Sequence, residues 1–224
     1  MDKMISSIKK FPDRRGKLKR LYDNFVFNIC GAVVTRRGSL LTKKDIKISK
    51  RKLRKGDILL LGNLRTAYSK IINEPITHAA LYMGGNKVIH AMGEDGVFCE
   101  RMLNIYKRYD TLVILRSNLK GKLKSDLIKN AKLEIGKPYD FSFSKKQDAY
   151  FCTEFVNKMF KKVGYKTRIV TIRKPISKSE RFLRNINNAA VSVKPGEFLK
   201  GNFIPIFFSH NLSYENKVVS LIRT

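Results

Sequence analysis

The sequence lacks a long apolar run and a recognisable secretory signal. Its longest apolar run, Phe25 to Val34 with Asn28 inside it, falls short of the ~20 residues that a membrane-spanning helix requires. The first twenty residues, MDKMISSIKKFPDRRGKLKR, contain neither the apolar core nor the small-residue cleavage site of a signal peptide. We therefore expect a cytoplasmic protein without a transmembrane helix, either fully soluble or peripheral at a membrane surface.

Cysteine is also scarce. The chain has three cysteines, Cys30, Cys99 and Cys152, and they are widely spaced. An odd number at this spacing suggests neither a disulfide framework nor a zinc site of the CxxC type. We expect a reducing compartment, and no metal or other cofactor.

Acidic residues are few, at 18 Asp and Glu against 47 Lys and Arg, and the formal net charge is +29. Such a surface attracts nucleic acid, anionic lipid and acidic polymers alike. A genome biased towards Lys codons is the alternative explanation. The basic residues are spread along the whole chain without an aromatic recognition motif, which disfavours a specific nucleic-acid role and leaves an anionic membrane surface as a possible partner.

The length of 224 residues and the 43% hydrophobic content indicate one domain with extensions. Residues 1–52 form a basic N-terminal extension, residues 53–165 the core, and residues 166–224 a basic segment that completes the same domain. In the extension, the apolar island LYDNFVFNICGAVV predicts a helix that ends near Gly31. That helix is either an interfacial anchor or an extra helix packed across the domain.

The core begins with short apolar runs separated by turn residues, which predict a mostly antiparallel sheet of about four to six strands. Gly84-Gly85-Asn86 tolerates positive φ and predicts a hairpin turn. The expected strands are 58–61, 79–83, 87–91, 97–102 and 112–115, with an edge strand at 203–208 that contains Pro205.

Helical spacing predicts two helices in the second half of the core. The first carries an apolar stripe and is closed by Gly136 and Pro138. The second begins near Cys152 and ends at Gly164, and a short helix is expected further on, near Ser179 to Asn188. The stripe of the first helix consists of Leu123, Leu127, Ile128, Ala131 and Ile135.

Cys152 stands in the stretch YFCTEFVN, at the start of an amphipathic helix whose wet side carries Lys158, Lys161 and Lys162. Unpaired backbone N–H groups and the helix dipole at that position predict a lowered thiol pKa and a reactive thiolate. The alternative is a buried structural cysteine, the usual state of a lone free thiol. The apolar side is formed by Phe151, Phe155, Val156, Met159, Phe160 and Val163.

Two of the three histidines bracket the predicted hairpin. His78 opens its first strand and His90 closes its second, so strand pairing brings both to the same end. If the Cys152 helix packs on that sheet, a thiol, a base and an orienting group converge, as nucleophilic acyl transfer requires. His78 would then take the thiol proton, and His90 would fix the orientation of His78.

An oxyanion formed at this site needs hydrogen-bond donors. The backbone N–H of Cys152 is one candidate. Tyr139, Tyr150 or a loop amide could supply the second, and Asp140 is either a loop hydrogen bonder or a supporting group of the site.

We expect structural roles for four other residues that could carry chemistry. Cys99 alternates within a strand and is expected in the core, whereas His210 lies in a polar turn and is expected to face solvent. Glu94 and Asp95 follow His90 and could orient it in principle, but their flanking glycines favour a turn.

The order GDILLLGN, THAALYMGGNKVIHAMG, GKPYDFSF and YFCTEFVNKMF resembles the circularly permuted papain-like enzymes of the NlpC superfamily. The resemblance covers residues 53–165, roughly half the chain. The YiiX-like bacterial proteins are the most similar group, and the lecithin:retinol acyltransferase family and a related poxviral group are more distant.

The resemblance implies an α+β, papain-like fold in which an antiparallel sheet packs against the nucleophile helix, with basic N- and C-terminal extensions. It also implies Cys152 as nucleophile, His78 as base and His90 as second polar member. YiiX-like proteins usually carry Glu where this chain has His90, whereas the acyltransferases carry His there, which favours the acyltransferases for the triad chemistry. GKPYD and the Cys-Thr-Glu-Phe-Val sequence are nevertheless more YiiX-like.

These features predict a cysteine-dependent hydrolase or acyltransferase that cleaves an amide, ester or thioester through an acyl-enzyme on Cys152. A lipid or acylated-protein substrate suits the basic surface, because anionic membranes attract each nearby Lys or Arg by ~1 kcal/mol. One alternative is a peptidoglycan amidase or endopeptidase, which would require export. Another is a non-catalytic papain-like module that binds membrane or nucleic acid.

Overall fold

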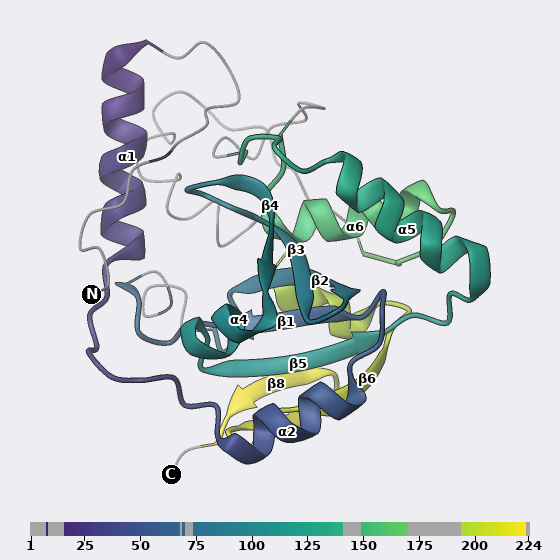
Figure 1. Cartoon of the computed structure of the whole chain (residues 1–224). Helices are drawn as coiled ribbons and strands as arrows, with labels where there is room; N and C mark the ends of the chain where they lie inside the picture. The colour runs from purple at the N-terminus through teal and green to yellow at the C-terminus, as the bar shows by residue number, and fades with distance from the viewer. Residues whose placement is uncertain are drawn as a thin grey trace.

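A six-stranded antiparallel sheet forms the centre of the molecule, in the order β4-β3-β2-β1-β5-β6 (Figure 1). The computed structural model describes residues 8, 16–67, 69, 74–140, 149–169 and 194–222. The antiparallel sheet predicted from the sequence is confirmed. Its strands are β1 Ile58–Gly62, β2 His78–Gly84, β3 Lys87–Met92, β4 Gly96–Arg101, β5 Thr111–Arg116 and β6 Ile204–Phe208.

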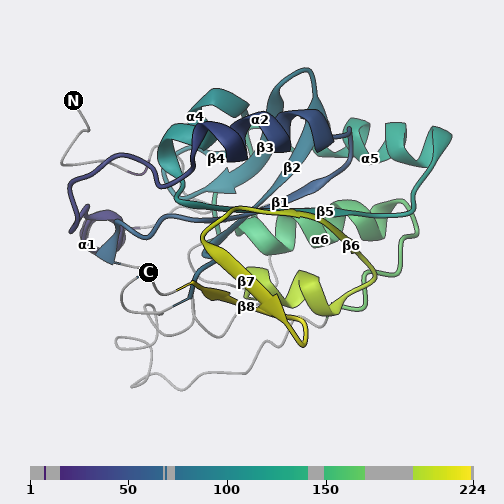
Figure 2. The ribbon, with the colours of Figure 1, turned by 90° about the horizontal axis from the view of Figure 1, so that it is seen from below.

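Both faces of the sheet are covered, which explains why the central strands are continuous apolar runs rather than alternating ones. In β1, Ile58 and Leu60 belong to one buried cluster, and Leu59 and Leu61 belong to another on the opposite face. Figure 2 shows α2 and α4 on one side of the sheet and α6 on the other. The covering helices are α2 Lys43–Lys52, α4 Met102–Arg108, α5 Gly121–Leu133 and α6 Cys152–Lys162.

The β2–β3 hairpin turns where the sequence predicts. Gly84, Gly85 and Asn86 have φ values of 89°, 59° and 56°, a region that glycine and asparagine tolerate. The turn sets the register of the two strands, so that Leu81 lies opposite Ile89 and Tyr82 opposite Val88. The beginning of β2 and the end of β3 therefore share one end of the sheet.

One helical prediction needs correction, and one helix was missed. Leu127, Ile128 and Ala131 of α5 are buried as expected, but Leu123 and Ile135 are 48% and 44% exposed, because only the middle of the stripe reaches α6 and the sheet. The helix α4 was not predicted at all. It follows β4 without a turn, and its seven residues are too few for periodicity to separate helix from strand.

The C-terminal residues contribute to the same core. The edge strand β6 pairs with β5, and Pro205 lies on this edge, where a missing N–H is tolerated. The 3-10 helix η1, Pro195–Lys200, packs Phe198 and Leu199 into the cluster that also holds α6. Strands β7 Leu212–Glu215 and β8 Val218–Leu221 form a separate two-stranded sheet.

The N-terminal helix α1, Lys17–Gly31, ends at the predicted glycine. Three of its apolar residues, Leu18, Leu21 and Phe25, are 84%, 69% and 61% exposed. None of the helices in the described ranges is long and apolar enough to cross a membrane. The short helix expected near Ser179 to Asn188 lies outside the described residues.

Candidate active site

Cys152 is the first residue of α6 and lies beside the beginning of β2. Its sulfur lies near the backbone N–H groups of Ala79, Cys152 and Thr153, which act to lower the thiol pKa. The helix holds this position because its apolar face is buried against the sheet, as the sequence pattern predicts. The buried residues of that face include Phe155, Val156, Met159 and Phe160.

The two hairpin histidines contact each other. His78 Nε2 lies 2.9 Å from His90 Nδ1, a normal hydrogen-bond distance. The rings meet edge to face, with their centroids 5.0 Å apart, and both side chains are buried. Because Ala79 follows His78 directly and its N–H lies near the Cys152 sulfur, the thiol lies at the same strand end as the histidine pair.

The thiol pKa differs from the sequence-based expectation. Burial raises the pKa of Cys152 to about 11, although the N–H groups of Ala79, Thr153 and Cys152 act in the opposite direction. The helix start does favour the thiolate, but desolvation outweighs that effect. The resting cysteine is therefore a thiol, and it needs a base to become a nucleophile.

A carboxylate extends the histidine pair. Glu100 Oε1 on β4 lies 3.0 Å from His90 Nε2 and 2.7 Å from Arg108 Nη1. Glu100 was not predicted from the sequence as a site residue, although strand pairing contains the signal. His90 lies opposite Phe98 and Val88 opposite Glu100, so Glu100 is the diagonal neighbour of His90 on the same face.

Burial opposes ionisation of Glu100, but contacts with His90 and Arg108 outweigh it and lower the pKa of the carboxyl. The carboxylate oxygen lies off the N–H direction of His90 Nε2, so the contact is electrostatic rather than a well-formed hydrogen bond. Glu100 is therefore an anion facing one nitrogen of His90.

This anion selects the tautomers of both rings. A negative oxygen favours the proton on His90 Nε2, which leaves Nδ1 as an acceptor. His78 must then donate from Nε2, and His78 Nδ1 carries the free lone pair. Burial, followed by the neighbouring His90 and Arg108, lowers the pKa of His78 well below the ordinary value, so this imidazole is neutral at pH 7. A neutral imidazole with a free lone pair is a competent base.

Residues 52–202 match a family described as permuted papain-like amidase enzymes of the YaeF/YiiX type, the C92 family. The chain belongs to this family. The resemblance to YiiX-like proteins and the papain-like α+β fold are thereby confirmed. Membership also makes the protein a cysteine hydrolase or amidase of papain-like type.

A solved structure supports the fold of this permuted papain-like amidase. The metalloprotein yiiX from Escherichia coli O157:H7 is similar over 70% of this chain and 97% of its own, with a TM-score of 0.54 and 21% sequence identity. No curated protein matches the chain. The description as a metalloprotein applies to the Escherichia coli protein. In the described part of this amidase, no group of three or more His, Cys, Asp or Glu side chains is arranged to hold a metal ion.

The tyrosines predicted as oxyanion donors in the amidase lie side by side where the chain enters α6. Tyr150 is buried, and its hydroxyl donates to Glu134 Oε2 at 2.8 Å, so it supports the entry into α6. Tyr139 pairs with Tyr150 through a parallel β-bridge, and the Asp140 N–H donates to the Tyr150 carbonyl oxygen. These contacts join residues 139–140 to Tyr150, at the entry into α6.

The remaining polar residues occupy structural positions. Cys99 is half-buried, with its sulfur 3.4 Å from Met83 Sδ beside the core. His210 is exposed as expected, but its Nδ1 also lies 2.7 Å from Asp45 Oδ2, a contact that the sequence did not indicate. Glu94 and Asp95 lie in the turn between β3 and β4, and Glu100 occupies the place beside His90.

Proposed function

We propose that this permuted papain-like amidase cleaves its substrate through an acyl-enzyme on Cys152, with His78 as the base and His90 as the orienting residue. The observation that carries the proposal is the 2.9 Å contact between His78 Nε2 and His90 Nδ1, next to a thiol at a helix start. His90 fixes the tautomer of His78, and Glu100 fixes that of His90.

Acylation begins when His78 Nδ1 takes the proton of the Cys152 thiol as the sulfur attacks the substrate carbonyl carbon. A C–S bond forms, and the carbonyl π electrons move to oxygen as an oxyanion. The N–H of Cys152 lies at the start of α6, where it can donate to that oxygen. The imidazolium then returns its proton to the leaving amine, alcohol or thiol, and the bond to that group breaks.

Deacylation repeats the sequence with a new nucleophile. Water or an acceptor molecule gives its proton to His78 and attacks the thioester carbonyl. The C–S bond then breaks as His78 returns that proton to the sulfur, which restores the thiol and releases the acyl group as an acid, ester or amide. Water gives a hydrolase, and an acceptor amine or alcohol gives a transferase. Water is the simpler acceptor for a member of an amidase family, so we favour hydrolysis of an amide.

The second part of the proposal concerns where the enzyme works. A lipid or acylated-protein substrate at an anionic membrane surface fits the net charge of +29. Leu18, Leu21 and Phe25 are exposed at helical spacing on α1, beside the exposed basic residues Lys17 and Arg20. An exposed apolar stripe with basic neighbours is typical of an interfacial helix and favours this alternative over an extra helix packed across the domain.

A substrate screen tests the catalytic proposal. Acyl esters, acyl-lysine peptides and peptidoglycan fragments are incubated with the wild-type protein and with Cys152→Ala, and released product is measured. We expect turnover of at least one acyl class that Cys152→Ala abolishes. Turnover of peptidoglycan fragments alone would indicate that the substrate is peptidoglycan rather than a lipid or acylated protein. Equal turnover by both proteins would refute the acyl-enzyme.

Vesicle sedimentation tests the membrane proposal separately. Vesicles of phosphatidylcholine with and without phosphatidylserine are mixed with the wild-type protein and with Leu18→Ser/Phe25→Ser. We expect binding that requires phosphatidylserine and falls several-fold in the variant. Binding that depends on charge alone and is unchanged in the variant would contradict a role for α1.

A further inference from the structure

Tyr109 lies against the base of the proposed catalytic pair. Its ring is parallel to that of His78, with an interplanar angle of 8° and centroids 5.7 Å apart, and the residue is buried. It comes directly after α4 and before β5, in a stretch without a sequence motif. Tyr109 is close enough to Cys152 for the charge of a thiolate there to raise the pKa of the phenol, although burial is the largest cause of that rise.

Arg108 lies beside the Tyr109 side chain. Its guanidinium contacts both oxygens of Glu100, at 2.7 and 3.3 Å, and is near enough to Tyr109 to oppose the rise in the phenol pKa. Because Arg is a donor only, the Tyr109 oxygen can only accept from it, which leaves the hydroxyl proton to donate elsewhere. Because burial raises the phenol pKa, that proton stays in place through neutral and alkaline pH.

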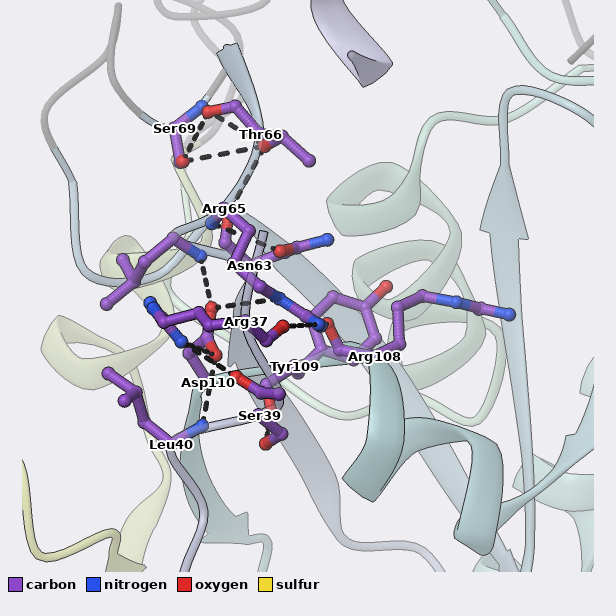
Figure 3. Close-up of polar contacts among 12 residues, drawn as sticks. Arg37, Ser39, Leu40, Asn63, Arg65, Thr66, Ser69, Arg108, Tyr109 and Asp110 are labelled. Carbon is purple, nitrogen blue, oxygen red and sulfur yellow. Dashed lines mark hydrogen bonds and ion pairs between the residues drawn. The ribbon is translucent and has the colours of Figure 1, made fainter. Parts of the chain in front are cut away.

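The backbone of this stretch is held rigidly by a cluster around Asp110 (Figure 3). The buried Asp110 carboxylate accepts from Arg37 Nη1 at 2.7 Å and from the Leu64 N–H at 2.8 Å. Arg65 donates to the Lys107 carbonyl oxygen at 3.1 Å, and the Ser39 hydroxyl donates to the Tyr109 carbonyl oxygen. A donor fixed before the reaction stabilises developing charge without reorganisation.

We propose that the Tyr109 hydroxyl is the second donor to the oxyanion, opposite the N–H of Cys152. The inference rests on the proposed function, because it requires an acyl-enzyme on Cys152. It replaces Tyr150 in that role, since the Tyr150 hydroxyl is bonded to Glu134. Arg108 then lies beside both groups, because it binds Glu100 and neighbours the Tyr109 side chain.

Two reactions of the same thiol separate an oxyanion donor from a structural residue. Acylation by p-nitrophenyl butyrate forms an oxyanion, whereas alkylation by iodoacetamide displaces iodide and forms none. We expect Tyr109→Phe to slow acylation by about 10²–10³-fold, the typical loss for one such donor, while alkylation of Cys152 changes less than about two-fold. Tyr214→Phe, remote on β7, is the matched control and should leave both rates unchanged.

The outcomes distinguish this inference from the proposed function. If wild-type protein is not acylated on Cys152, the proposed function fails. If Cys152 is acylated and Tyr109→Phe is acylated as fast as wild type, only the Tyr109 role fails. A parallel fall in both reactions would make Tyr109 a support for His78 and overturn the donor role.

A measurement on unsubstituted protein covers the case in which Tyr109→Phe does not fold. Protein labelled with ¹³Cζ-tyrosine is treated with butyraldehyde, which forms a hemithioacetal on a reactive thiol. We expect the resonance of one buried tyrosine to shift in wild-type protein and not in Cys152→Ala. An adduct on Cys152 without any tyrosine shift would overturn the proposal.

Discussion

His78 Nε2 and His90 Nδ1 lie 2.9 Å apart between neighbouring strands, and behind them Glu100 lies 3.0 Å from His90 Nε2. In the proposed mechanism this order would make His78 Nδ1 the free base, and no resting thiolate would be needed. A neutral imidazole and a neutral thiol form the resting pair, because burial lowers the pKa of one and raises that of the other.

Replacing the Glu100 carboxylate tests the tautomer argument. Glu100→Gln keeps the shape but removes the charge that holds the proton on His90 Nε2. We expect kcat for acyl-ester turnover to fall about 10–10²-fold, with little change in KM. This loss is smaller than the ~10⁴-fold seen when the residue that orients the base itself is replaced, because Glu100 acts on the base only through His90. Glu215→Gln on the exposed end of β7 is the control. An unchanged kcat in Glu100→Gln would contradict the proposal that Glu100 sets the tautomers of His90 and His78.

The pH dependence of kcat/KM follows from the state of His78. Protonation of His78 removes the base, so activity is lost as pH falls through the pKa of His78. Because burial lowers that pKa, the acid limb should lie below the ordinary histidine value of 6.5. A pH profile of p-nitrophenyl butyrate hydrolysis locates the limb. An acid limb above pH 6.5 would show that His78 is not the buried neutral base described here.

Glu134 stabilises the entry into α6 through Tyr150, Lys137 and Lys162. Burial opposes ionisation, but these partners lower the carboxyl pKa to about 2, so its contribution is full above the unfolded pKa and disappears as pH falls towards 2. We expect Glu134→Gln to lower the free energy of unfolding by about 1–3 kcal/mol at pH 7. Urea unfolding of wild type and Glu134→Gln at a series of pH values measures this difference in unfolding free energy.

The matched control for Glu134 is Glu197→Gln, which removes an exposed pair with Lys200. Such a pair contributes only about 0–1 kcal/mol. The difference between wild type and Glu134→Gln should narrow at acidic pH. A constant difference from pH 7 to pH 3 would contradict the ionised state of Glu134.

Asp110 is the centre of the cluster that fixes the Tyr109 backbone. Asp110→Asn leaves Arg37 and Arg65 without their shared negative charge, and we expect a loss of about 3–5 kcal/mol in unfolding free energy. Asp126→Asn on α5 is only half-buried and should change stability by less than about 0.5 kcal/mol. Equal stability of the two variants in thermal and urea unfolding would contradict the structural role of the cluster.

The local features of this fold are readable in the sequence. The apolar runs of the strands, the Gly84-Gly85-Asn86 turn and the helical stripe after Cys152 each depend on neighbouring residues, and each appears where expected. The meeting of His78 and His90 also follows, because a tight hairpin leaves little freedom for its two ends.

The features that could not be predicted depend on contacts between distant segments. Tyr109 reaches His78 only through the short helix α4, whereas Glu100 was missed although the register of the neighbouring strands β3 and β4 contains its signal. The thiol pKa was predicted in the wrong direction, because the helix start is visible in the sequence and the depth of burial is not.

The proposed mechanism requires Cys152 to carry the acyl group. Intact-protein mass spectrometry after rapid mixing with p-nitrophenyl butyrate measures it directly, with peptide mapping of the modified residue. We predict one butyryl group per chain on Cys152, slower adduct formation in His78→Ala, and none in Cys152→Ala. Butyrylation at another residue, or hydrolysis by Cys152→Ala at the wild-type rate, would contradict it.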